Sequence, residues 1–137
     1  MSPWRWMAAV AIAPGLLTAV QPALAAPDAV RGELIYARCL ACHALAFDRV
    51  GPRHCGLLGR KAGSVPGFAY SQAMKKSNVV WDAPSLDRFM ASPMKAMPGT
   101  AMTYDGIPDG RQRADLVAYL KQVDRTPACR PGARPAR

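Results

Sequence analysis

Two cysteines and a histidine stand in a fixed spacing near the start of the chain: Cys39, Cys42 and His43, in the pattern C-x-x-C-H. Residues three apart lie on one side of a helix or tight turn, so both thiols can add to the two vinyl groups on one edge of a porphyrin. His43 follows directly and can reach the iron from one side of the ring. The motif predicts covalent haem attachment, with Cys39 and Cys42 as thioether sites and His43 as an iron ligand.

Paired cysteines have two other common uses, a redox dithiol or half of a zinc site. A closed zinc site needs four ligands, and beyond the pair the chain offers only His43, His54, Cys55 and Cys129. A thioredoxin-like dithiol needs a preceding strand and βαβ patterning around it, and the sequence shows neither. Covalent haem is therefore the favoured interpretation.

A haem held in this way needs its second axial position assigned. A thioether ligand raises the reduction potential, whereas an open position favours small-molecule chemistry. Most methionines fill cores, but Met102 lies in the loop formed by residues 98–102, far enough from His43 to approach the opposite face of the ring. The other methionines after residue 25 are Met74, Met90, Met94 and Met97.

The first 25 residues have the pattern of a secretory signal peptide. Arg5 and the amino terminus give a positive start, residues 7–20 are largely apolar, and residues 23–25 (ALA) form an A-x-A-like cleavage site. The alternative is a retained membrane anchor, but Pro14 and Gly15 interrupt the apolar run, which is shorter than the ~20 residues of a span. We expect cleavage near Ala25, export to the periplasm and no other transmembrane helix.

The whole chain has 137 residues, of which 50% are hydrophobic and 20% charged, as in one small soluble domain. A domain of this size has a limited core, so a large apolar cofactor would also fill it. The net charge is +9, which steers encounters with acidic surfaces. The basic residues are spread from Arg31 to Arg137 without an aromatic platform, so nucleic acid is not an expected partner.

Helical patterns surround the candidate site. Apolar spacing and end signals predict helices over residues 27–37, 70–76, 83–91 and from Asp109 to about Val123. Asp28 and Asp109 are the expected caps, Ser71 lies near the start of the second helix, and Pro93 is expected to stop the third. Glycines and prolines predict irregular segments over residues 44–67 and 94–106 and an irregular tail over 126–137. An irregular segment as long as residues 44–67 needs a packing partner, and the edge of a haem would provide one.

Further motifs follow in a single order: Gly51-Pro52, residues 56–61 (GLLGRK), 66–70 (PGFAY), Trp81, 98–102 (PGTAM) and 115–120 (DLVAYL). With C-x-x-C-H they make the chain resemble a small soluble class I cytochrome c of the mitochondrial and alphaproteobacterial type. The resemblance implies an all-α fold of four to five helices around one covalent haem c, with crossing terminal helices. The resemblance runs from about Gly32 to Lys121, and we expect the domain to span residues 26–125.

The resemblance also implies roles for single residues. His43 and Met102 would be the axial ligands, and the Pro52 carbonyl would orient His43. Gly32 and Tyr36 would pack against the helix that bears Tyr119. Side chains that can donate hydrogen bonds to buried carboxylates would hold the haem propionates, namely Arg60, Tyr70, Trp81 and Thr100.

Some positions depart from the family pattern. Phe89 stands where a tyrosine is common near the methionine sulfur, and Ala101 and Met94 replace residues that are often basic. Docking to acidic partners would then depend on four lysines in particular, which are Lys61, Lys75, Lys76 and Lys95.

Two spare cysteines, Cys55 and Cys129, predict an intramolecular disulfide in an exported protein. His54 is expected to be a surface residue and not a ligand.

These features together indicate a periplasmic electron carrier, and not an enzyme, that cycles between Fe(III) and Fe(II) for respiratory or dehydrogenase partners. We expect a monomer that makes brief contacts with redox proteins and membrane complexes. Two alternatives stay open: a dedicated electron-accepting subunit of one periplasmic dehydrogenase, or a ligand-binding, peroxidase-like haem protein if Met102 is labile.

Overall fold

Helices form all the regular secondary structure in the part of the chain described by the computed structural model, residues 25–130 and Gly132. Extended backbone pairs there only at one bridge, between Lys61 and Val80. The predicted all-α fold is confirmed. The helices are α1 (Ala29–Tyr36), η1 (Ala37–Cys39), α2 (Gln72–Lys76), α3 (Ala83–Ala91), α4 (Pro93–Ala96), α5 (Gly110–Val123) and η2 (Pro127–Cys129), where η marks a single 3-10 turn.

The predicted signal peptide lies outside the described residues, except for Ala25. Within the described part, no helix combines the length and apolar character needed to cross a bilayer.

Local sequence signals set the starts of the main helices. The Asp28 carboxylate accepts hydrogen bonds from the backbone N–H groups of Val30 and Arg31 at 2.8 and 3.2 Å. Asp109 caps α5 in the same way, and the Ser71 hydroxyl caps α2. These contacts satisfy N–H groups that the first turn leaves unpaired. They confirm Asp28 and Asp109 as caps and the position of Ser71 near the start of α2.

Two segments are more ordered than the sequence predicts. Residues 94–106 were expected to form a loop after Pro93, yet Pro93 begins the short helix α4. The prediction failed because proline both ends a helix that precedes it and suits the first position of a helix that follows it. The tail was expected to be irregular, and it contains the 3-10 turn Pro127–Cys129.

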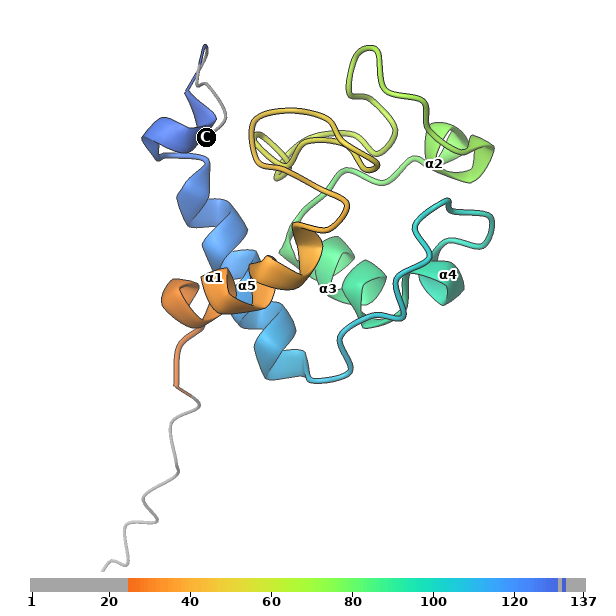
Figure 1. Cartoon of the computed structure of the whole chain (residues 1–137). Coiled ribbons are helices and arrows are strands. Elements are labelled where there is room, and N and C mark those ends of the chain that lie inside the picture. The colour runs from red at the N-terminus through yellow and green to blue at the C-terminus, as the bar shows by residue number, and fades with distance from the viewer. Residues whose placement is uncertain (1–24, 131, 133–137) are drawn as a thin grey trace, which may run out of the picture.

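The terminal helices α1 and α5 cross closely, as Figure 1 shows. A Cβ atom added to Gly32 would collide with the carbonyl oxygen of Asp115 and would lie 2.7 Å from the Cβ of Tyr119. Beside this contact the rings of Tyr36 and Tyr119 pack with centroids 5.1 Å apart. The crossing and the predicted packing of Gly32 and Tyr36 on the helix of Tyr119 are confirmed.

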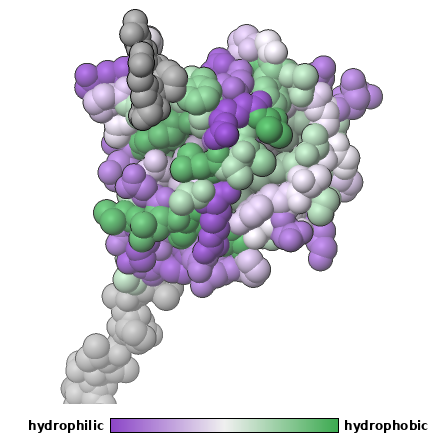
Figure 2. Space-filling view, viewed as in Figure 1, coloured by the Kyte–Doolittle hydropathy of each residue, from purple (hydrophilic) through white to green (hydrophobic). Residues whose placement is uncertain are grey.

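Helix α1 has a buried side and an exposed side. Gly32, Ile35 and Tyr36 are buried, whereas Val30 and Leu34 are 70% and 73% exposed. Figure 2 shows hydrophobic side chains over α1 and across the middle of the same face. The core therefore lies on the other side of α1, and its buried members are Ile35, Tyr36, Leu57, Ala62, Trp81, Leu86, Phe89, Met90, Ile107, Leu116 and Leu120.

Candidate functional site

The end of α1 places the C-x-x-C-H residues on one turn. Helix α1 continues into the 3-10 turn η1, which ends at Cys39. The backbone N–H groups of Cys42 and His43 then donate to the Cys39 carbonyl at 3.1 and 2.8 Å. Neither Cys39 nor Cys42 is in a disulfide. The turn thus offers two free thiols and an imidazole, as covalent haem attachment requires.

The Cys39 thiol does not have the environment of a redox cysteine. Burial raises its pKa to about 11, whereas catalytic and redox cysteines have a lowered pKa. Nor do the described residues contain a group of three or more His, Cys, Asp or Glu side chains able to hold a metal ion. The geometry therefore favours neither of the two alternatives to haem.

His43 is held in the form that can bind a metal. Its side chain is 9% exposed, and its Nδ1 lies 2.8 Å from the carbonyl oxygen of Pro52. Since a carbonyl oxygen can only accept, Nδ1 carries the proton and Nε2 has the free lone pair. Burial lowers the pKa of His43, although the Pro52 hydrogen bond opposes this, so the neutral ring is favoured.

The loop after the motif packs directly on the imidazole. The N–H of Gly51 donates to the Cys42 carbonyl at 2.8 Å, and a Cβ atom at Gly51 would collide with the His43 ring. Glycine is therefore required for the chain to pass this close to His43 and still present the Pro52 carbonyl to it.

Met102 is partly buried and packs against the core. Its backbone N–H donates to the Thr100 hydroxyl at 3.3 Å, so Thr100 and Met102 form one local turn. Met74 and Met97 have the same degree of burial. The choice of Met102 as a ligand therefore rests on its position in the loop and on the family pattern.

The structure brings Arg60 and Trp81 together. The N–H of Trp81 donates to the Arg60 carbonyl at 2.9 Å, and the Trp81 ring is buried against Phe89 with centroids 5.1 Å apart. The Arg60 guanidinium donates to the backbone carbonyls of Arg53 and Cys55 at 2.8 and 3.0 Å. Because a guanidinium has five N–H donors, three remain for a carboxylate.

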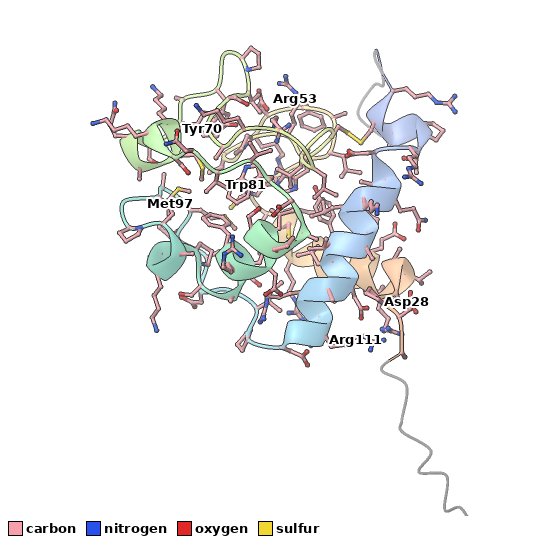
Figure 3. All side chains as sticks on the ribbon, turned by 180° about the vertical axis from the view of Figure 1, so that it is seen from behind. Asp28, Arg53, Tyr70, Trp81, Met97 and Arg111 are labelled. Atoms are coloured by element: carbon pink, nitrogen blue, oxygen red, sulfur yellow. A yellow bond between two sulfur atoms is a disulfide. The ribbon has the colours of Figure 1, made fainter. Side chains whose placement is uncertain are left out.

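Tyr70 lies on the same side of the molecule as Trp81, away from the helix crossing marked by Asp28 and Arg111 in Figure 3. Its hydroxyl is 3.4 Å from the N–H of Val65. Burial raises the pKa of Tyr70, and the hydrogen bond from Val65 and the positive charge of Arg60 oppose this only in part. The indole, phenol and guanidinium groups suit the two carboxylates of a haem.

His54 is not the surface residue that the sequence predicts. It is partly buried, and its ring stacks on that of His43 with centroids 4.2 Å apart and an interplanar angle of 22°. Burial, with smaller contributions from the neighbouring His43 and Arg60, lowers the pKa of His54 to about 3. No local pattern could reveal this, because the groups around the ring come from other segments.

Cys55 and Cys129 occupy a separate place from the haem-motif cysteines. Their sulfur atoms are 1.97 Å apart and their Cα atoms 5.2 Å apart, in disulfide geometry. The pair joins the loop after His54 to η2. Close by, the N–H of Gly56 donates to the Asp124 carboxylate at 2.7 Å, so the loop is fixed both to η2 and to the end of α5.

The fold and these side chains together define a class: a small helical protein whose terminal helices cross and whose free thiols, neutral histidine and methionine fit a covalently attached haem. The sequence profile of the family described as "Cytochrome c" matches residues 29–124. The chain therefore belongs to the cytochrome c family, as a class I c-type cytochrome of the alphaproteobacterial type.

Individual relatives agree with this assignment. Cytochrome c2 of Rhodomicrobium vannielii is 43% identical over 101 residues, which cover 72% of this chain and 81% of the relative. Cytochrome c2 of Blastochloris viridis is 41% identical over 112 residues, covering 80% and 87%. The solved structure of cytochrome cH from Methylobacterium extorquens is 44% identical with a TM-score of 0.68, covering 69% of this chain and 98% of that one. Proteins of this family carry one covalent haem c and act as electron carriers.

Proposed function

We propose that this chain is a periplasmic one-electron carrier in which His43 and Met102 are the axial ligands of iron and Cys39 and Cys42 are the thioether sites. One observation carries the proposal: His43 donates through Nδ1 to the Pro52 carbonyl, and none of the described residues hydrogen-bonds to its Nε2. When bound, the haem supplies reversible one-electron chemistry.

The chain's own residues set the conditions for that chemistry. Pro52 fixes the tautomer of His43, which makes Nε2 the ligand atom. If Met102 also held the iron, a bound haem would have no open position for a substrate, which would distinguish a carrier from a ligand-binding enzyme. Trp81 and Phe89 are buried, and we expect them to help exclude water from the haem.

Four donor side chains are proposed to hold the haem propionates: Arg60, Tyr70, Trp81 and Thr100. Support comes from the pairing of Arg60 with Trp81 through their backbones and from the polar groups that these side chains carry. Carboxylates in a partly buried site need hydrogen-bond donors.

Redox protein partners with acidic surfaces fit the charge of the chain. The four lysines expected to carry docking are all exposed, and they are Lys61, Lys75, Lys76 and Lys95. Exposed charges speed diffusional encounter, and salt weakens their effect. We therefore expect brief docking by a monomer, with electron-transfer rates that fall as ionic strength rises.

Export and a Cys55–Cys129 disulfide complete the proposal. The signal pattern of residues 1–25 supports secretion, and disulfides persist in oxidising compartments. The geometry of the two sulfur atoms is consistent with such a bond.

The test is expression of the full chain with a c-type haem maturation system, followed by three measurements on the periplasmic fraction. We expect haem that stays with the denatured polypeptide, a reversible one-electron titration, and no carbon monoxide binding by the reduced protein at neutral pH. The matched control replaces both Cys39 and Cys42 with serine and should lose the covalent haem. Rapid carbon monoxide binding would contradict the carrier function and favour a ligand-binding haem protein.

A further inference from the structure

His54 is a second imidazole beside the candidate iron ligand, and its ring is the flat surface against which His43 lies. The two ring centroids are 4.2 Å apart and the planes differ by 22°, which is a stacked arrangement. A hydrogen bond at Nδ1, such as the one to Pro52, fixes one edge of the His43 ring. It leaves the ring free to rock about that edge, and a stacked neighbour limits this motion.

The His54 ring is itself fixed from the far side. Its Nδ1 is 3.1 Å from the hydroxyl of Tyr36, and the two rings meet edge to face with centroids 5.6 Å apart. Tyr36 is only 3% exposed and belongs to α1. The contact therefore runs from the crossing of the terminal helices to His54 and on to His43.

The backbone on both sides of His54 is also held. Its N–H donates to the carbonyls of Ala44 and Leu45, both at 3.1 Å, and the N–H of Cys55 donates to Leu45 at 2.8 Å. The Arg60 guanidinium binds the carbonyls of the two residues that flank His54. These hydrogen bonds on both sides of the residue leave its ring little freedom to move away.

We propose that His54 is a positioning residue for His43: held by the Tyr36 hydroxyl and by its anchored loop, its stacked ring fixes the plane of the axial imidazole. The inference rests on the proposed function, because it needs His43 to be the ligand. Groups that do not touch the metal are known to orient ligands and tune metal centres in this way. Here the group is an aromatic ring and not another hydrogen bond.

The test measures the orientation of the His43 ring directly. In an oxidised low-spin haem protein, the spread of the haem-methyl proton resonances depends on the plane of the axial imidazole. His54→Leu removes the flat ring and the hydrogen bond and should change this spread and the midpoint potential. His54→Phe keeps a flat ring without the hydrogen bond and should restore most of the wild-type spread.

A second pair of variants tests the chain of contacts without touching His54. Tyr36→Phe removes only the hydroxyl that meets His54 and should change the resonances in the same sense as His54→Leu, by a smaller amount. Tyr119→Phe is the matched control, because Tyr119 packs on Tyr36 but has no hydrogen bond to His54. It should leave the spectrum at its wild-type positions. If His54→Leu does not fold, the comparison of Tyr36→Phe with Tyr119→Phe still tests the positioning role of His54.

The proposal is overturned if His54→Leu has the wild-type resonances and potential, if leucine and phenylalanine at residue 54 shift the resonances equally, or if Tyr36→Phe behaves as Tyr119→Phe does. Failure of the proposed function would look different. In that case the wild-type protein itself would lack covalent haem or a low-spin spectrum, and both proposals would fall together.

Discussion

The carboxylate of Asp115 on α5 accepts a hydrogen bond from the guanidinium of Arg31 on α1, with Arg31 Nε 2.8 Å from Asp115 Oδ2. Asp115 is only 2% exposed. Its Oδ1 also accepts from the backbone N–H of Asp28 at 2.7 Å and lies 3.4 Å from Arg111 Nε. This one carboxylate therefore joins the start of α1 to α5 beside the point where the helices cross.

Acid should weaken the contacts that the Asp115 carboxylate makes between α1 and α5. The hydrogen bond from Arg31 lowers the pKa of Asp115 to about 2 from its ordinary 3.8, with further help from the N–H of Asp28 and the charge of Arg111. A lowered carboxyl pKa gives stability that is present above the ordinary pKa and lost as pH falls toward the lowered one. We expect the thermal midpoint to fall between about pH 4 and pH 2.

The measurement compares thermal midpoints over this pH range for the wild type and Asp115→Asn. The variant should be less stable at neutral pH and should show a flatter profile in acid. Asp105→Asn removes the same charge at an exposed position and serves as the control. Equal pH profiles for the wild type and Asp115→Asn would contradict the role of this carboxylate.

Gly32 is expected to tolerate no side chain. Alanine favours a helix over glycine by about 1 kcal/mol, but its Cβ here would collide with the backbone of Asp115. Overpacking of this kind costs about 1 to 3 kcal/mol. Gly32→Ala should therefore lower the free energy of unfolding, measured in guanidinium. Gly110→Ala is the matched control, since its Cβ would meet no backbone and only the end of the Arg113 side chain, at 3.3 Å. Equal effects of the two changes would refute the close crossing.

The Cys55–Cys129 pair should contribute to stability. The two residues are separated by 74 positions in the sequence, and a cross-link restricts the unfolded chain most when it closes a long loop. Replacing both with serine should cost about 2 to 5 kcal/mol in the free energy of unfolding. Reductant should lower the stability of the wild type and not that of the double variant. Alkylation of two thiols in the non-reduced native protein would show that the bond does not form.

Some elements could be predicted from local chemistry alone. Asp28 and Asp109 mark the starts of α1 and α5 because a capping carboxylate acts within three residues of its own position. The bounds of the third predicted helix, residues 83–91, are those of α3. Proline is ambiguous, because it can end one helix and begin the next. The sequence predicts only the first role for Pro93, and this is why it does not predict α4.

The surroundings of the site were less predictable. The C-x-x-C-H spacing is typical of covalent haem attachment, so the sequence alone singles out the two thiols and His43 as candidate site residues. His54 could not, because its stacking partner and the Tyr36 hydroxyl lie 11 and 18 positions earlier in the chain and reach it only in the folded protein. The side-chain contacts of Arg60 with two backbone carbonyls likewise depend on how the loop folds.

Methionine ligation is the central claim, and the near-infrared absorption of the oxidised protein tests it most directly, because a band there arises from charge transfer between a methionine sulfur and Fe(III). Met97→Ala is the matched control, since Met97 is partly buried and packs against the same core as Met102. We predict that the wild type and Met97→Ala show the band, and that Met102→Ala loses it and has a lower midpoint potential. A Met102→Ala protein that keeps both the band and the wild-type potential would contradict the account.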